Sequence, residues 1–458
     1  MLLAAYSAVQ LRARPLAYGW PFVLYIAVPL LITIGLIGVR FLPATLRAQT
    51  AQILIVVGLS FWFAELVATV IPARKESSHM RAARSLGIPY DSRSPREIVR
   101  ASQMRGDRIW PSISPEHFLR HNTRLRIGDT SILPLTTGPS QQTLVYCNEN
   151  GRYVFYRSNA WGFRDPNPPM LNSPATLVLL GDSFVQGACV DRGETFADRL
   201  RAIWPRTANL GVGGTGPIAQ LGVLQEYGAS LRPSYVVWFF NEGGDLAEIG
   251  QERSVNVLQR YLTEGAHQAL RARTARTAVA LERYMERRLL LPQVMRHRKT
   301  WKQWLLLDRL RSRMRWFADR SEVMSVDPNA ILGLIQVLDR GRAIADGWGG
   351  RLIVVYLPIW SRYGSPGEAM VERTAILRAL DANDFDVVDM HKIFRAHSDP
   401  LSLFPMRVPG HYNAEGSALV AQTVASGICT TVADRKSDES PSALLQACEA
   451  FSRAPLTQ

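Results

Sequence analysis

Hydrophobic residues form two long runs near the start of the chain. Residues 15–39 carry no charged side chain, and this run exceeds the roughly 20 apolar residues that a helix needs to cross a bilayer. A second run, residues 51–71, is interrupted only by Glu65. The pattern predicts a membrane anchor of two transmembrane helices within residues 1–72. Glu65 is interpreted either as an interfacial carboxylate near the end of its span or as a buried polar group with a function.

Basic residues flank both runs and bear on the orientation in the membrane. A hairpin with both ends in the cytoplasm is favoured by the residues outside the pair, which are Arg12, Arg14, Arg74, Lys75, Arg81 and Arg84. Arg40 and Arg47 flank the connecting loop and oppose that orientation. The pattern predicts a multi-pass membrane protein, with the remainder of the chain on either the periplasmic or the cytoplasmic side.

From residue 174 the pattern changes to short apolar runs that alternate with longer amphipathic stretches. Such alternation is typical of an α/β domain with a mainly parallel sheet. The predicted strands are residues 175–180, 207–210, 235–240, 352–357 and 385–388, and the predicted helices are residues 194–203, 218–229, 328–345, 366–382 and 414–426. One α/β domain is therefore predicted over residues 174–432.

The segments on either side of this domain are less regular. Residues 73–173 are interpreted as a linker and a hairpin-containing segment that lead into the domain, and residues 73–125 as a partly helical linker over the membrane surface. Within them, residues 144–157 contain two β-rich runs around Asn-Glu-Asn-Gly, which predicts a hairpin. Residues 433–458 form a polar, peripheral tail with one short helical pattern.

Basic residues are concentrated in one segment of the predicted domain. The chain has a formal net charge of +14, and residues 255–320 supply most of it, with sixteen Lys and Arg against five Asp and Glu. Apolar residues recur at helical spacing among them, so a basic helical insertion is predicted. It is either a solvated face of helices packed on the core or a surface for anionic headgroups or an acidic glycan. No nucleic-acid motif accompanies the charge, and no nucleic-acid partner is expected.

The four cysteines are Cys147, Cys189, Cys429 and Cys448. Their spacing lacks the CxxC or Cys/His patterns of zinc sites, so neither a metal nor another cofactor is expected. Their even number permits two disulfides in an oxidising compartment, and four buried free thiols are an equally good interpretation.

Four polar elements follow the predicted strands or precede the last helix. Ser183 lies in Leu-Gly-Asp-Ser-Phe after the first strand, and Gly214 lies in the glycine-rich run after the second. Asn241 and Asp245 follow the third strand, and His411 comes just before the last helix. Ligands bind at the carboxyl ends of parallel strands, where a serine with a base and aimed backbone N–H groups can act as a nucleophile.

These elements, in this order, resemble the SGNH/GDSL hydrolase superfamily over residues 174–428. The sequence segments around the elements resemble those of membrane-anchored bacterial GDSL-type proteins. The resemblance implies a flavodoxin-like three-layer α/β/α domain. It implies that Ser183 is the nucleophile, that His411 is the general base, and that the backbone N–H groups of Ser183 and Gly214 form the oxyanion hole. Asp182, Asn241, Asp245 and Asp399 are possible supporting residues.

The sequence departs from the superfamily pattern at two positions. Gly244 stands where the resemblance implies an asparagine that donates to the oxyanion. Val408 and Pro409 stand where it implies an aspartate before the histidine, and Asp399 is the nearest acid upstream. Three outcomes stay open: a Ser-His dyad oriented by a backbone carbonyl, another acid at His411, or weak or absent activity.

The favoured function is that of a serine esterase or acyltransferase. Two membrane spans and a basic insertion favour O-acyl groups of a membrane-proximal substrate, which is a cell-envelope polysaccharide or a lipid-linked glycan. The expected partners are the bilayer and this substrate. The alternative is a catalytically lapsed SGNH domain that binds glycans or scaffolds an envelope polysaccharide assembly.

Overall fold

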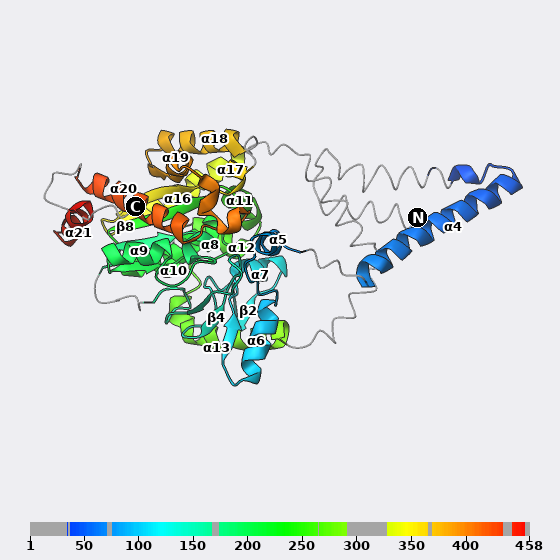
Figure 1. The fold of residues 1–458 in the computed structure, drawn as a ribbon, viewed down its shortest axis with the longest axis horizontal. Coiled ribbons are helices and arrows are strands. Elements are labelled where there is room, and N and C mark those ends of the chain that lie inside the picture. The colour runs from blue at the N-terminus through cyan, green and yellow to red at the C-terminus, as the bar shows by residue number, and fades with distance from the viewer. Residues whose placement is uncertain are drawn as a thin grey trace. The chain divides into compact units, whose positions relative to one another are not determined.

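The computed structural model of the protein divides into two compact units (Figure 1). The first comprises Met1–Lys75 and Pro292–Met324, and the second comprises Glu76–Leu291 and Ser325–Gln458. The structure describes residues 34, 37–70, 76–166, 174–263, 265–290, 328–364, 369–433 and 442–453.

In the first unit the principal described element is helix α4 (Ala44–Val70). Its segment Ala44–Val67 has a mean hydropathy of 1.8, and among the described residues it is the one helix long and apolar enough to cross a membrane. It covers nearly all of the predicted second span. The predicted first span, residues 15–39, lies outside the described residues apart from residues 34 and 37–39. Glu65 is 1% exposed, so its carboxyl is buried.

Five parallel strands form the central sheet of the second unit. They are β6 (Leu177–Leu180), β7 (Thr207–Asn209), β8 (Tyr235–Asn241), β9 (Arg351–Leu357) and β10 (Asp386–Asp389). The strands lie in the order β10-β9-β8-β6-β7, which is the flavodoxin-like order. This confirms the predicted α/β fold. The strand order reverses between β6 and β8, the point at which such sheets bind ligands.

Helices cover both faces of the sheet, because alternate side chains of each buried strand point to opposite sides. Val237 and Phe239 of β8 pack with α9 (Phe196–Ile203), α19 (Met390–Ala396) and α20 (Ala414–Ala433). Val236 and Trp238 pack on the other side. That layer contains α10 (Pro217–Glu226), α11 (Asp245–Arg253), α16 (Pro328–Asp346) and α18 (Ala369–Ala382). The short helices α8 (Ser183–Gln186) and α17 (Ser361–Gly364) lie after β6 and β9.

The segment before the sheet is folded and shares the core of the α/β domain. Its helices are α5 (Ser78–Ser85), α6 (Pro95–Met104) and α7 (Pro115–Arg120). Its strands are β1 (Ile109–Pro111), β2 (Leu125–Ile127), β3 (Thr130–Ile132), β4 (Thr143–Val145) and β5 (Phe155–Arg157). Strands β4 and β5 are antiparallel, as the hairpin pattern predicts, and β1 extends their sheet. Trp110, Phe118 and Leu125 belong to the same buried cluster as Trp238, so this segment packs on the domain.

The described part of the basic insertion also packs on the core. It contains α12 (Asn256–Gln259) and α13 (Thr274–Met285), with 3₁₀ turns at Arg260–Leu262 and Arg271–Arg273 and a π turn at Glu286–Leu290. Leu281 and Met285 are buried, whereas Arg276, Arg283 and Arg287 are exposed. This arrangement matches the first interpretation of the insertion, in which helices pack on the core and turn a charged face to solvent. Residues 291–327 lie outside the described part.

The end of the chain is attached to the domain by its last helix. Helix α21 (Ser442–Arg453) buries Leu444 and Cys448 against α20. A disulfide joins Cys448 to Cys429 of α20. The short helical pattern predicted in the tail therefore corresponds to α21, which is attached to α20.

Candidate active site

Strand β6 presents Ser183 at the reversal point of the sheet. After Leu180 the chain turns through Gly181 and Asp182, and Ser183 begins α8. Asp182 Oδ1 accepts a hydrogen bond from Phe184 N at 2.9 Å, which is the usual contact of a helix N-cap. This cap fixes the turn, so the Ser183 hydroxyl lies at the carboxyl end of the strand.

His411 lies beside Ser183, although 228 residues separate them in the sequence. Its Nε2 is 2.7 Å from Ser183 Oγ, within reach for proton transfer. The neighbouring Tyr412 is buried and donates its hydroxyl hydrogen to Pro358 O at 2.6 Å. The Phe184 ring lies 4.8 Å from the imidazole. These contacts hold the imidazole at the serine.

The carboxylate at His411 comes from the β4–β5 hairpin. Glu149 Oε1 is 2.8 Å from His411 Nδ1, and Glu149 Oε2 accepts the backbone N–H of His411 at 2.8 Å. This carboxylate is therefore Glu149 and not Asp399, which is exposed and pairs with Arg407. Ser183, His411 and Glu149 thus form a hydrogen-bonded chain of the kind found in catalytic triads.

The charges around His411 favour its role as a base that can hold a proton. Burial lowers the pKa of His411, but the hydrogen bond and charge of Glu149, together with the charge of Asp182, raise it above the ordinary value of 6.5. Burial raises the pKa of Glu149, and its contacts with His411 lower it more strongly. A second histidine, His79 of α5, faces Glu149, and burial lowers its pKa. A proton taken from Ser183 is thus best held on His411.

The supporting residues expected near the serine form a second hydrogen-bonded chain. Asn241 Nδ2 donates to Asp182 Oδ2 at 2.7 Å, and Asn241 N donates to Asp245 Oδ2 at 2.8 Å. Burial raises the pKa of both Asp182 and Asp245. One N–H of the Asn241 side-chain amide is therefore bound to Asp182, the residue before Ser183.

Two backbone N–H groups are available at the serine. Within the described part of the chain, those of Ser183 and Gly214 donate no hydrogen bond, whereas Gly213 N donates to Gln186 Oε1 at 2.7 Å. Gly214 has a φ of +66°, which favours glycine. A Cβ there would lie 2.8 Å from Glu116 Oε2. This geometry suits a pair of oxyanion donors.

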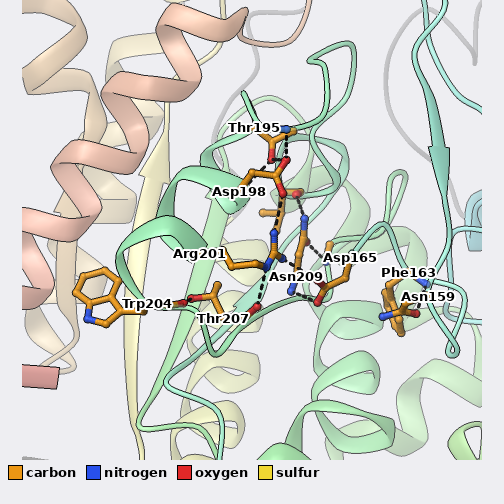
Figure 2. Close-up of polar contacts among 12 residues, drawn as sticks. Asn159, Phe163, Asp165, Thr195, Asp198, Arg201, Trp204, Thr207 and Asn209 are labelled. Carbon is orange, nitrogen blue, oxygen red and sulfur yellow. Dashed lines mark hydrogen bonds and ion pairs between the residues drawn. The ribbon is translucent and has the colours of Figure 1, made fainter. Parts of the chain in front are cut away.

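A second network of polar side chains surrounds Arg201 (Figure 2). Arg201 bridges two carboxylates, donating to Asp165 at 2.8 Å and to Asp198 at 2.6 Å. Asp165 also accepts Asn209 N at 3.0 Å, and Asn209 Nδ2 donates to Val185 O in α8 at 2.8 Å. The segment before the sheet is thereby tied through β7 to the helix that Ser183 begins.

A disulfide joins the loop that carries Glu149 to the segment that follows Ser183. Cys147, two residues before Glu149, bonds to Cys189. Asn150 Nδ2 donates to Cys189 O at 2.7 Å, and Arg152 pairs with Asp191. Cys189, Glu149 and His411 bring potential metal ligands close together, but the sulfur is in a disulfide and supplies no thiolate. The Cys147–Cys189 bond holds the loop that carries Glu149 beside the segment that follows Ser183.

Replacing both Cys147 and Cys189 with serine should lower kcat by about 100-fold, the cost of a displacement of about 1 Å in a catalytic group. The disulfide spans 42 residues, so its loss should also reduce the free energy of unfolding by about 4 kcal/mol. The measurements are hydrolysis of p-nitrophenyl acetate, well below the unfolding midpoint, and urea unfolding.

The second disulfide provides the matched control. Cys429 and Cys448 are 19 residues apart, and replacing both with serine should cost about 3 kcal/mol of stability while leaving kcat unchanged. Equal losses of kcat in the two variants would show that the first disulfide acts only through stability.

No known protein family and no curated protein matches the sequence. Similar solved structures include a two-domain esterase active on acetylated mannans, with 13% identity over 59% of this chain and 52% of that chain and a TM-score of 0.31. An α/β hydrolase enzyme from the metagenome of Lake Arreo, Spain, has 15% identity over 56% and 97%, with a TM-score of 0.31. A putative acylhydrolase from Bacteroides fragilis has 14% identity over 57% and 92%, with a TM-score of 0.30.

The chain spans about half the length of the mannan esterase. At TM-scores near 0.3 these similarities carry no argument about activity. The function is therefore inferred from the chain's own site.

Proposed function

We propose that this chain is an SGNH-type serine hydrolase or acyltransferase that acts on acyl esters. The observation that carries the proposal is the hydrogen-bonded chain from Ser183 Oγ through His411 to the Glu149 carboxylate. Each group has the geometry its role requires: the base touches the nucleophile, and the acid touches the other nitrogen of the base. The carboxylate that the region before His411 lacks is supplied by the hairpin.

The proposed reaction proceeds in two steps. Ser183 Oγ attacks the ester carbonyl, its proton passes to His411 Nε2, and the carbonyl electron pair moves to the oxygen. When the tetrahedral intermediate collapses, the alcohol leaves with that proton and an acyl-serine remains. Water or a sugar hydroxyl then attacks the acyl-serine by the same route in reverse. The first acceptor makes the protein an esterase and the second makes it an acyltransferase.

We infer a membrane-proximal substrate, either a cell-envelope polysaccharide or a lipid-linked glycan that bears O-acyl groups. Helix α4 supports this because its length and composition suit a membrane span. The two disulfides support a catalytic domain on the oxidising side of the bacterial inner membrane, since such bonds persist there and are rare in the cytosol.

A fluorophosphonate probe tests the proposal, because it forms a covalent bond with an activated serine. The full-length protein in detergent should be labelled at Ser183, as mapped by mass spectrometry, and should release p-nitrophenol from p-nitrophenyl acetate. The rival function is a lapsed domain that only binds glycans. Absence of both labelling and hydrolysis in folded protein would favour that rival and overturn the proposal.

A further inference from the structure

Tyr146 places a hydroxyl group beside the nucleophile. It directly follows β4, and its backbone N–H donates to Val154 O at 2.9 Å across the hairpin. Gly213 has no side chain, and the position that a Cβ would take there lies 3.0 Å from Tyr146 Oη and 3.4 Å from Ser183 Cβ. The tyrosine hydroxyl and the serine therefore border the same small space beside Gly213.

This space adjoins the proposed oxyanion hole. Gly213 N donates to Gln186 Oε1 at 2.7 Å, so the next N–H along the chain, that of Gly214, is the one left to bind an oxyanion. Because Gly213 and Gly214 are consecutive, Tyr146 Oη lies beside the peptide that carries this donor. A carbonyl oxygen held by the N–H groups of Ser183 and Gly214 is then within reach of the tyrosine hydroxyl.

The contacts of the Tyr146 hydroxyl differ from those of the neighbouring Tyr156. The two rings meet edge to face, with 6.0 Å between their centroids, and the Tyr156 hydroxyl bonds to Ser112 Oγ and Gln186 Nε2. Tyr146 is only partly buried, and within the described part of the chain its hydroxyl has no hydrogen-bond partner. Since a tyrosine hydroxyl in the interior usually has a partner, this one is left to bind a ligand.

We propose that the Tyr146 hydroxyl is a third oxyanion donor and hence a further catalytic residue of the proposed serine hydrolase. It donates a hydrogen bond to the carbonyl oxygen as negative charge develops there, together with the N–H groups of Ser183 and Gly214. Tyr146 keeps its own proton throughout, so the two steps of acyl transfer remain balanced as written above. This inference rests on the proposed function and deepens it.

The surroundings of Tyr146 keep its hydroxyl neutral. Burial raises the pKa of Tyr146 well above its ordinary value. The pKa is raised further by three neighbours, Tyr156, Asp182 and Glu149. Arg164 opposes them but does not reverse the shift. The hydroxyl should therefore remain a donor at every pH at which the imidazole acts as a base.

The Tyr146→Phe variant tests the role, because it removes the hydroxyl oxygen and keeps the ring. The kcat for p-nitrophenyl acetate should fall about 100-fold or more, the usual cost of one oxyanion donor, with little change in KM. The loss should be equal on both sides of neutral pH, and the acid limb set by His411 should not move. Urea unfolding should match the wild type, because the hydroxyl has no protein partner to lose.

An inhibitor separates oxyanion binding from other causes of a lower kcat. A trifluoromethyl ketone forms a tetrahedral adduct with an active serine and places an oxyanion in the hole. Its affinity for Tyr146→Phe should fall by the same factor as kcat/KM. Tyr153→Phe is the matched control, since Tyr153 lies on the same hairpin and donates its hydroxyl hydrogen to Arg93 O at 2.6 Å. Its kcat and its affinity for the ketone should equal those of the wild type.

Two results would overturn the inference while leaving the proposed function intact. One is a kcat for Tyr146→Phe within a few-fold of the wild type. The other is a loss of kcat without a matching loss of affinity for the ketone, which would show that the hydroxyl does not bind the oxyanion. Failure of the proposed function itself looks different, because the wild type would then show neither fluorophosphonate labelling at Ser183 nor hydrolysis.

Discussion

The His411→Ala variant should hydrolyse p-nitrophenyl acetate on the order of 10⁶-fold more slowly than the wild type, and Ser183→Ala should be equally slow. The reason is the 2.7 Å contact between His411 Nε2 and Ser183 Oγ. Without the imidazole, the serine hydroxyl keeps its proton and is a poor nucleophile. Without the serine, the imidazole has no proton to accept. Steady-state kcat measurements provide the comparison.

The double variant Ser183→Ala/His411→Ala makes the prediction specific. Because the two groups act as one unit, the double variant should be no slower than either single variant, within a few-fold. If each replacement instead lowered kcat independently, so that the losses multiplied, the residues would not be a nucleophile–base pair. Fluorophosphonate labelling should be lost in Ser183→Ala and strongly slowed in His411→Ala.

Much of the α/β domain is visible in the sequence because its strands are buried on both faces. The runs at β6 and β8 are continuously apolar, since helices cover both sides of the sheet. Polar or glycine-rich segments end each run, and the carboxyl ends of parallel strands share one edge. Ser183 and Gly214 could therefore be predicted to lie near each other before any contact was known.

Glu149 could not be predicted in the same way. It lies in an Asn-Glu-Asn-Gly segment whose local pattern predicts a turn, and its contact with His411 joins residues 262 positions apart. The hairpin of β4 and β5 is visible in the sequence, but the contact depends on how this hairpin packs against the α/β domain, which a local pattern does not reveal. The sequence did contain one indication of this contact. Cys147 lies two residues before Glu149 and Cys189 lies six residues after Ser183, so a disulfide between them would bring Glu149 near Ser183.

The packing of the segment before the domain also could not be predicted from local sequence patterns. Its polar, proline-punctuated stretches read as a linker because α6 and α7 begin at Pro95 and Pro115 and its strands are short. Its buried residues, such as Trp110 and Phe118, are widely spaced and follow no single period. Their burial against the sheet is a tertiary effect, and it brings Glu116 and Glu149 to the site.

The Glu149→Gln variant should lower kcat by about 10⁴-fold, as expected when the acid of a triad is replaced by its amide. Glu149 Oε1 accepts the hydrogen on His411 Nδ1, which leaves the lone pair of Nε2 facing Ser183. The amide of glutamine can instead donate to Nδ1, which favours the opposite tautomer and removes that lone pair. The size of this loss separates a true triad from a Ser-His dyad, in which Glu149 would matter little.

The pH profile of the same variant supplies a second readout. Glu149 raises the pKa of His411, and kcat/KM rises with pH as His411 loses its proton. In Glu149→Gln the residual activity should therefore have its acid limb at lower pH than in the wild type. Asp399→Asn is the matched control: Asp399 is exposed and pairs with Arg407, so kcat and the acid limb should be unchanged. A large loss in Asp399→Asn, with a small one in Glu149→Gln, would show that the acid acting on His411 is not Glu149.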